Sequence, residues 1–171
     1  NDLLVLQGDP GSTIARQTSV ADAADAGRIA YDPDDNAGVG GSLLGSGSVN
    51  GDEELITYTG LAPVNDTTPA TRLDFFATAA GEIIDITDGP VISGFQTLSV
   101  NASTFEEQRI ANKTTVTING LDGADTFTLN YSSAIFGIGT LELYGNELTN
   151  GTLVGDDAAG DTIIALATSV D

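Results

Sequence analysis

Three stretches of this chain repeat one pattern: an apolar run, a turn rich in Gly and Asp, an acidic residue and a second apolar run. The stretches are RLDFFATAAGEIIDIT, TVTINGLDGADTFTLN and TLVGDDAAGDTIIALA, and their alignment places Glu82, Asp125 and Asp161 at the same position. These acids are 43 and 36 residues apart, and one further pair of short strand-like runs lies in each interval. The elementary unit is therefore two strands in about 20 residues, the size of one coil of a parallel β-solenoid.

Alternating polarity within these runs indicates strands with one buried face. The residues on that face are Leu73 and Phe75, Val116 and Ile118, Phe127 and Leu129, and Leu141 and Leu143. A coil of two strands cannot bury this face alone, whereas stacked coils share one apolar interior. The sequence thus predicts an all-β fold, a parallel β-solenoid (β-helix) of short two-strand coils over residues 52–171. An antiparallel β-sandwich of short strands fits the same spacing of turns and is the alternative.

Residues 1–51 are predicted to form an irregular N-terminal region that serves as a cap or connector. An apolar strand near the N-terminus ends at a Gly-Asp-Pro turn. Ser19 as N-cap, Asp22 in capping-box register and Gly27 as the C′ residue predict one short helix with an Ala-rich body. A Gly- and Asp-rich loop over 32–51 follows and separates this region from the repeat-built domain of residues 52–171.

Charge and composition exclude several classes of function. The chain has 25 acidic and 5 basic side chains, a net charge of −20, and no His or Cys. Zinc sites of the usual ligand type, Ser-His-Asp or thiol nucleophiles, and disulfides are therefore excluded. A strongly negative chain repels a phosphate backbone, so we expect no nucleic-acid partner. The longest apolar runs are far shorter than the ~20 residues of a membrane helix, so we expect no membrane span.

One segment matches a known calcium-binding repeat. In Gly120-Leu-Asp-Gly-Ala-Asp-Thr-Phe-Thr128, Gly120, Gly123, Asp125 and Phe127 follow the nonapeptide G-G-x-G-x-D-x-U-x, with Leu121 in place of the second Gly. Here the chain resembles the haemolysin-type (RTX-like) calcium-binding repeats in degenerate form. The chain also resembles repetitive β-rich bacterial surface proteins and adhesins. This second resemblance rests on ITYTGLAP, the stretch from FQTLSVNASTFEE to TINGLDGADTFTL, and GDDAAGDTI. The resemblance implies a cell-surface protein with Ca²⁺ bound between stacked turns.

Two groups of acidic turn residues are candidate Ca²⁺ ligands, because this ion prefers hard oxygen ligands on Gly-rich turns. The group at the repeat corners consists of Asp122, Asp125, Asp156, Asp157 and Asp161. The second group, Asp32, Asp34 and Asn36, supplies positions 1, 3 and 5 of an EF-hand-like loop, although position 12 is Leu43 rather than Glu. Solvated Asx turns are the alternative for both groups.

Further predictions concern sugars. Asn-x-Ser/Thr sequons make Asn65, Asn101, Asn112, Asn130 and Asn150 candidate glycosylation sites. A carbohydrate-binding adhesive module is an alternative function, with contacts from Tyr58, Phe76, Phe95, Tyr131, Phe136 and Tyr144, although core positions explain such residues more simply. A β-helix polysaccharide hydrolase or lyase is the weaker alternative. Gly155-Asp156-Asp157 resembles one element of the polygalacturonase pattern, but the His-containing turn and basic clamp are missing. We predict that the chain is not an enzyme.

The two ends of the chain predict self-association. Both NDLLVLQGDPG and AAGDTIIALATSVD look like solenoid strands, and neither has the Lys- or Pro-rich composition that keeps an exposed edge unpaired. We expect copies to join head to tail into a fibre or lattice, with divalent cations bridging acidic turns. The alternative is that residues 1–171 are one domain of a longer adhesin whose neighbouring parts cover these edges. The predicted function is that of a structural, non-catalytic subunit or module of an extracellular bacterial fibre, surface layer or adhesin.

Overall fold

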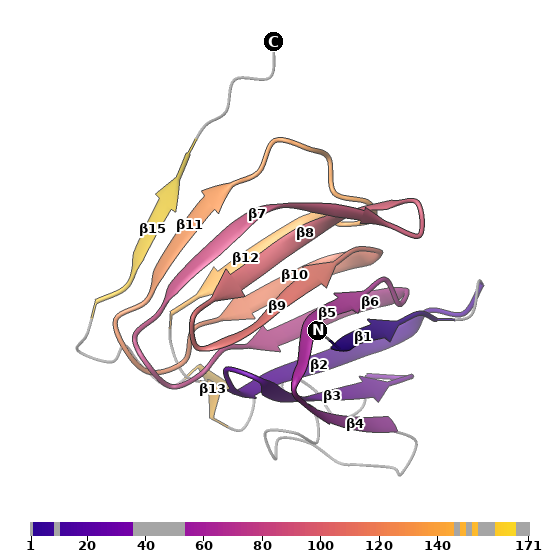
Figure 1. The fold of residues 1–171 in the computed structure, drawn as a ribbon, viewed down its shortest axis with the longest axis horizontal. Helices are drawn as coiled ribbons and strands as arrows, with labels where there is room; N and C mark the ends of the chain where they lie inside the picture. The colour runs from indigo at the N-terminus through magenta and orange to yellow at the C-terminus, as the bar shows by residue number, and fades with distance from the viewer. Residues whose placement is uncertain are drawn as a thin grey trace.

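The structure, a computed structural model, describes residues 2–8, 11–35, 54–145, 148–149, 152–153 and 160–166. All regular secondary structure within these residues is β-strand, which confirms the predicted all-β fold (Figure 1). The strands are β1 (Asp2–Leu6), β2 (Ile14–Ala23), β3 (Ala26–Asp32), β4 (Glu54–Thr59), β5 (Leu61–Asp66), β6 (Ala70–Phe76), β7 (Ile83–Ile92), β8 (Phe95–Ala102), β9 (Phe105–Ile110), β10 (Lys113–Asn119), β11 (Thr126–Asn130), β12 (Thr140–Tyr144), β13 (Leu148–Thr149), β14 (Thr152–Leu153) and β15 (Thr162–Ala165). In this described part of the chain there is no helix with the length and hydropathy needed to cross a bilayer.

The strands form two large mixed sheets. Sheet A has the order β1-β5-β9-β8-β7-β11-β15, and sheet B has the order β12-β10-β6-β2-β3-β4. Seven of the eleven neighbouring pairs in these sheets are parallel, because β8 alone runs against the other strands of sheet A and β3 alone against those of sheet B. The mixed pairing is neither the uniform parallel solenoid nor the antiparallel sandwich. Residues 1–51 and 52–171 share both sheets, since β1 lies beside β5 and β2 beside β6.

The structure confirms the 43-residue spacing of the repeat but corrects its subdivision. Leu73 of β6 pairs with Val116 of β10, and Ile84 of β7 pairs with Phe127 of β11, so equivalent strands are neighbours. The predicted unit of about 20 residues is wrong, because the chain reverses through β8 within sheet A before β9 begins the next turn of the chain. We call each turn that places one strand in the series β2-β6-β10-β12 a tier. The predicted first strand of the third repeat is also wrong. The neighbour of β10 is β12, whereas Thr152 and Leu153 form β14 and pair with β13.

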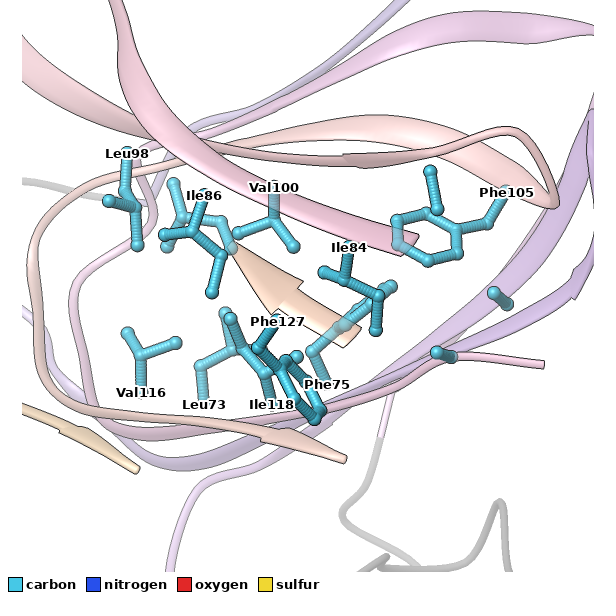
Figure 2. Packing of buried hydrophobic residues seen from close by; sticks show 14 residues of the cluster. Leu73, Phe75, Ile84, Ile86, Leu98, Val100, Phe105, Val116, Ile118 and Phe127 are labelled. Carbon is cyan, nitrogen blue, oxygen red and sulfur yellow. The ribbon is translucent and has the colours of Figure 1, made fainter. Parts of the chain in front are cut away.

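The two sheets pack face to face around an apolar core. Figure 2 shows Leu73, Phe75, Val116 and Ile118 of sheet B meeting Ile84, Ile86, Leu98, Val100, Phe105 and Phe127 of sheet A. Leu129, Leu141 and Leu143 pack against this cluster, so all four predicted pairs of inward residues are confirmed. A smaller cluster of Leu6, Ile29, Tyr58 and Val64 fills the space between β1, β3, β4 and β5.

The predicted helix over residues 19–27 is wrong, because this segment forms the β2–β3 hairpin. Asp22, predicted as part of a capping box, instead binds Arg28 across the hairpin, with Oδ1 2.7 Å from Nη2. Gly27 lies opposite Tyr58 of β4, and a Cβ at this position would overlap the Tyr58 ring and hydroxyl. Ala21 packs into the core. Pairing of this segment within the β2–β3 hairpin, and of β3 with β4, thus outweighs the helical propensity of the Ala-rich sequence.

Candidate functional site

Glu82, Asp125 and Asp161 are stacked at the corner that precedes β7, β11 and β15. Asp125 Oδ1 accepts the backbone N–H of Glu82 at 2.8 Å, and Asp161 Oδ1 accepts the N–H of Asp125 at 3.0 Å. Each Asp therefore holds the backbone of the acid in the preceding tier, an arrangement that we call the acid ladder. The alignment of these three acids in the sequence corresponds to neighbouring positions in the fold.

Two glycines make room for the aspartates of the ladder. A Cβ on Gly120 would overlap Asp125 Oδ2, and one on Gly145 would overlap Asp161 Oδ2. After β6, Ala77 takes the corresponding place, since its N–H donates to Asn119 O as the Gly120 N–H donates to Tyr144 O. Glu82 is longer, and its Oε1 accepts hydrogen bonds from the Thr78 N–H and hydroxyl and from the Thr104 hydroxyl. The carboxylates thus serve as structural acceptors at the corner.

The predicted calcium ligands are only partly brought together. Asp125 is buried and adjoins Asp161 in the ladder, whereas Asp122 is exposed in the same turn. Asp156, Asp157 and Asn36 lie outside the described residues. Within the described ranges, no three His, Cys, Asp or Glu side chains gather in a group that could hold a metal ion.

Asp32 forms an Asx turn after β3. Its Oδ1 accepts the N–H of Asp34 at 3.2 Å and the N–H of Asp35 at 2.8 Å, and Asp34 itself is exposed. These local backbone hydrogen bonds are those of an Asx turn, which is the alternative to an EF-hand-like calcium site at this position.

The sequons and the aromatic residues differ in accessibility. Asn101 and Asn130 are exposed, Asn112 is half-buried, Asn65 is buried in β5, and Asn150 lies outside the described residues. Tyr58 and Phe76 are buried, and Tyr131 and Tyr144 are half-buried. Phe95 and Phe136 form a tilted pair with ring centroids 4.5 Å apart. Phe95 also borders a groove of about 370 Å³ lined by Gln7, Ser93 and Asn112, and Phe136 is 47% exposed, so this pair is accessible to a ligand.

All five basic side chains lie in the described part of the chain, and each forms an ion pair with a carboxylate. Arg16 and Arg72 both bind the buried Asp74, and Arg72 also reaches Glu142, with Nη2 2.9 Å from Oε2. Arg16 is 58 residues from Asp74, and Arg72 is 70 residues from Glu142, so the register of β2, β6, β10 and β12 brings these partners together. Arg72 and Asp74 are two residues apart on β6. The two distant pairs are not visible in any local sequence pattern. Every basic side chain therefore has a carboxylate partner within the chain.

Lys113 is the most deeply buried cation. Its Nζ lies 3.0 Å from Asp66 Oδ1 and also donates to Thr68 O, while Gln17 donates to Asp66 Oδ2 at 2.6 Å. Burial lowers the pKa of Lys113 below its usual value, and Asp66 opposes this change. The cluster joins β2, β5 and β10 and therefore ties three tiers together.

β15 is the edge strand of sheet A at the opposite end from β1 (Figure 1). Ile84, Phe127 and Ile163 occupy one inward row across β7, β11 and β15, and their exposed fractions are 0%, 1% and 61%. Leu129 and Tyr131 line a shallow pocket there together with Ala165 and Leu166 of the β15 segment. A core row therefore continues onto an edge strand, where its last member is largely exposed.

Comparison of the whole chain with protein-family models, curated proteins and solved structures finds no match in any of the three. Function is therefore inferred from the chemistry and exposure of the residues described above.

Proposed function

We propose that the chain is a structural, non-catalytic subunit or module of an extracellular bacterial fibre, surface layer or adhesin, built by stacking copies end to end. The observation that carries this proposal is the exposed Ile163 at the end of the row that begins with Ile84 and Phe127. A position that is buried in two tiers and open in the third is one that a further tier would cover. Burial of an Ile side chain contributes about 1.5–3 kcal/mol, so covering it favours association.

We further propose that the tiers are those of a degenerate parallel β-solenoid, into which β3, β4 and β8 are inserted. The parallel series β2-β6-β10-β12 supports this view. Backbone hydrogen bonds also continue round the corners, as between the Ala77 N–H and Asn119 O at 2.9 Å and between the Thr67 N–H and Leu6 O at 3.1 Å. Stacked tiers of this kind add further tiers at their open ends.

An extracellular setting is supported by composition: the chain lacks Cys, and acidic residues outnumber basic ones five to one. Divalent cations between acidic turns belong to the proposal because copies with a net charge of −20 repel one another at low salt. Screening or bound cations must offset that repulsion before copies can meet.

Light scattering and negative-stain imaging over a range of protein concentrations test the proposal. We expect oligomers that grow with concentration and that Ile163→Lys abolishes. Ile83→Lys is the matched control, because Ile83 is 67% exposed on β7, in the middle of sheet A. A chain that stays monomeric at every concentration, or equal association by both variants, contradicts the proposal.

A carbohydrate-binding adhesive module is the second candidate, favoured by the Phe95–Phe136 pair beside Gln7 and Asn112. Aromatic faces flanked by amides suit sugar rings. Binding on a glycan array by the monomeric chain, with loss on Phe136→Ala, supports this candidate. An array without hits removes it.

A further inference from the structure

We propose that β15 of one copy adds in parallel to β1 of the next copy, with Ile163 opposite Leu4 and with Asp2 as the next member of the acid ladder. This inference rests on the proposed function and deepens it. It names the partner, a second copy of this chain, and the strands and register through which the two copies meet.

The direction of the two strands fits this addition. β1 and β15 are the end strands of sheet A, and they run the same way because only β8 is reversed. A second copy in the same orientation therefore presents β1 parallel to β15. The four parallel pairs already in sheet A are of this kind. Contact between two like edges related by a two-fold axis would instead be antiparallel.

The side chains of β1 and β15 are apolar on both faces. Leu3 and Val5 are 49% and 45% exposed on the outer face of β1, and Ile164 is 42% exposed on the outer face of β15. Central strands of sheet A carry mainly polar side chains on that face, such as Asp85, Ser99 and Arg109. Apolar side chains on the outer face of an edge strand gain apolar contacts when an equally apolar strand pairs with it, as Val5 would with Ile164. Both edges therefore carry side chains suited to pairing with each other.

Matching the faces of the two strands selects one register. Leu4 and Leu6 point inward on β1, and Ile163 and Ala165 point inward on β15. Because side chains alternate between faces, registers that keep inward residues together differ by two positions. With Ile163 opposite Leu4, each residue of β15 has a partner in β1. A shift of two positions one way places Asp2 in the core row, and the opposite shift moves half of β15 beyond Leu6.

The acid ladder favours the same register independently. With Ile163 opposite Leu4, Asp161 lies opposite Asp2 of the next copy. Each Asp of the ladder accepts the N–H of the acid in the preceding tier. Asp2 is exposed and would accept the N–H of Asp161 in the same way. The faces of the strands and the spacing of the acids thus agree on one arrangement.

Single cysteines test the contact, because the natural chain has no Cys. Val5→Cys and Ile164→Cys, one of them carrying a mass tag, are mixed in equal amounts and treated with a short bifunctional thiol reagent. We expect cross-linked heterodimers and few homodimers of either variant. In the control experiment, Leu55→Cys replaces Val5→Cys. Leu55 is exposed on β4, the edge strand of sheet B at the end of the molecule where β1 lies.

The outcomes separate this inference from the proposed function. Dominant homodimers, or equal yields with Val5→Cys and Leu55→Cys, overturn the β15–β1 contact. If the chain associates by light scattering without the expected cross-link, the structural role stands and the register is wrong. If the chain does not associate at all, both proposals are overturned.

Substitution of Asp2 tests the ladder itself. We expect Asp2→Ala to weaken association about three- to tenfold through the loss of one hydrogen-bond acceptor. Asp2→Asn keeps an acceptor and removes a charge, so this variant should associate at least as tightly as the natural chain. Asp85→Ala is the control, because Asp85 is exposed in the middle of sheet A. Equal effects of Asp2→Ala and Asp85→Ala contradict the assignment of Asp2 to the ladder.

Discussion

Single carboxylates hold the corners of this molecule in place. Asp125 is buried and accepts the N–H of Glu82, whereas Asp122 is exposed three residues earlier in the same turn. We expect Asp125→Ala to lower the free energy of unfolding by about 1–3 kcal/mol, because the Glu82 N–H loses its acceptor in a buried corner. Asp122→Ala should change it by less than about 0.5 kcal/mol. Urea unfolding of both variants measures the difference.

The same two variants distinguish a structural corner from a calcium site. If the corner bound Ca²⁺ as the sequence motif implies, the ion would stabilise the natural chain, and either substitution would remove that gain. If the carboxylates act as backbone acceptors, Asp125→Ala is destabilising with and without Ca²⁺, and Asp122→Ala is neutral in both. The second pattern is the one that we expect.

Lys113 provides a second prediction for a single residue. Lys113→Met leaves Asp66 buried without its cation, and we expect a loss of about 3–5 kcal/mol in the free energy of unfolding. Adding Asp66→Asn removes the unpaired charge and should recover most of that loss. Arg28→Met, in the more exposed pair with Asp22, should cost no more than about 1 kcal/mol. If the single and double variants are equally unstable in urea, the buried charge is not the cause.

Among the elements, the segment after β11 is fastened to β7 by one side chain. Asp88 accepts the N–H of Ser132 at 2.9 Å and the N–H of Ser133 at 3.0 Å, and these hydrogen bonds lower the pKa of Asp88 below its usual value. A lowered pKa stabilises the fold above the pKa of the unfolded chain, and this contribution is lost as pH falls through the pKa of the folded state.

The pH dependence of this contact can be measured by comparing the natural chain with Asp88→Asn in urea from about pH 6 to about pH 2. We expect the natural chain to be the more stable of the two at pH 6 and the difference to disappear at the acidic end. A difference that is constant with pH would mean that the charge of Asp88 does not strengthen the contact with Ser132 and Ser133.

Much of the element pattern could be predicted from local sequence. The alternation of Leu73 and Phe75 and of Val116 and Ile118 identifies two inward faces, and the spacing of Glu82 and Asp125 identifies two neighbouring strands. Both patterns recur because each tier needs apolar side chains in the interior and a hydrogen-bond acceptor for the backbone at the corner. The alignment of the three acids and the apolar edge strands could therefore be predicted from the sequence, whereas the role of Asp125 and Asp161 as acceptors of backbone N–H groups could not.

Features set by long-range contacts could not be predicted. The Ala-rich segment around Asp22 has helical composition, and it is a strand because it pairs within the β2–β3 hairpin, whose β3 strand pairs with the distant β4. β5 contains Pro63 and ends in Asn65 and Asp66, so its composition does not indicate a strand. The antiparallel course of β8 depends on which neighbours its two edges meet. The Lys113–Asp66 pair likewise arises from register, which no local pattern encodes.

At the scale of the whole molecule, internal ion pairs leave the surface strongly acidic. All five cations are engaged within the chain, so the many other carboxylates have no basic side chain of the same copy as a counterion. Two copies that approach end to end meet as like charges. The Debye length is about 30 Å at 0.01 M salt and about 8 Å at 0.15 M, so this repulsion extends across the contact at low salt and is short-ranged at higher salt.

Assembly should therefore depend on cations, and a bridging ion should act differently from a screening ion. We expect the chain to be monomeric in EDTA at low salt and to associate more in CaCl₂ than in NaCl of equal ionic strength, because one Ca²⁺ can bind carboxylates of two copies at once. Light scattering at matched ionic strength measures this difference. Equal association in the two salts would mean that cations only screen the repulsion, and the bridging role proposed for divalent ions would be wrong.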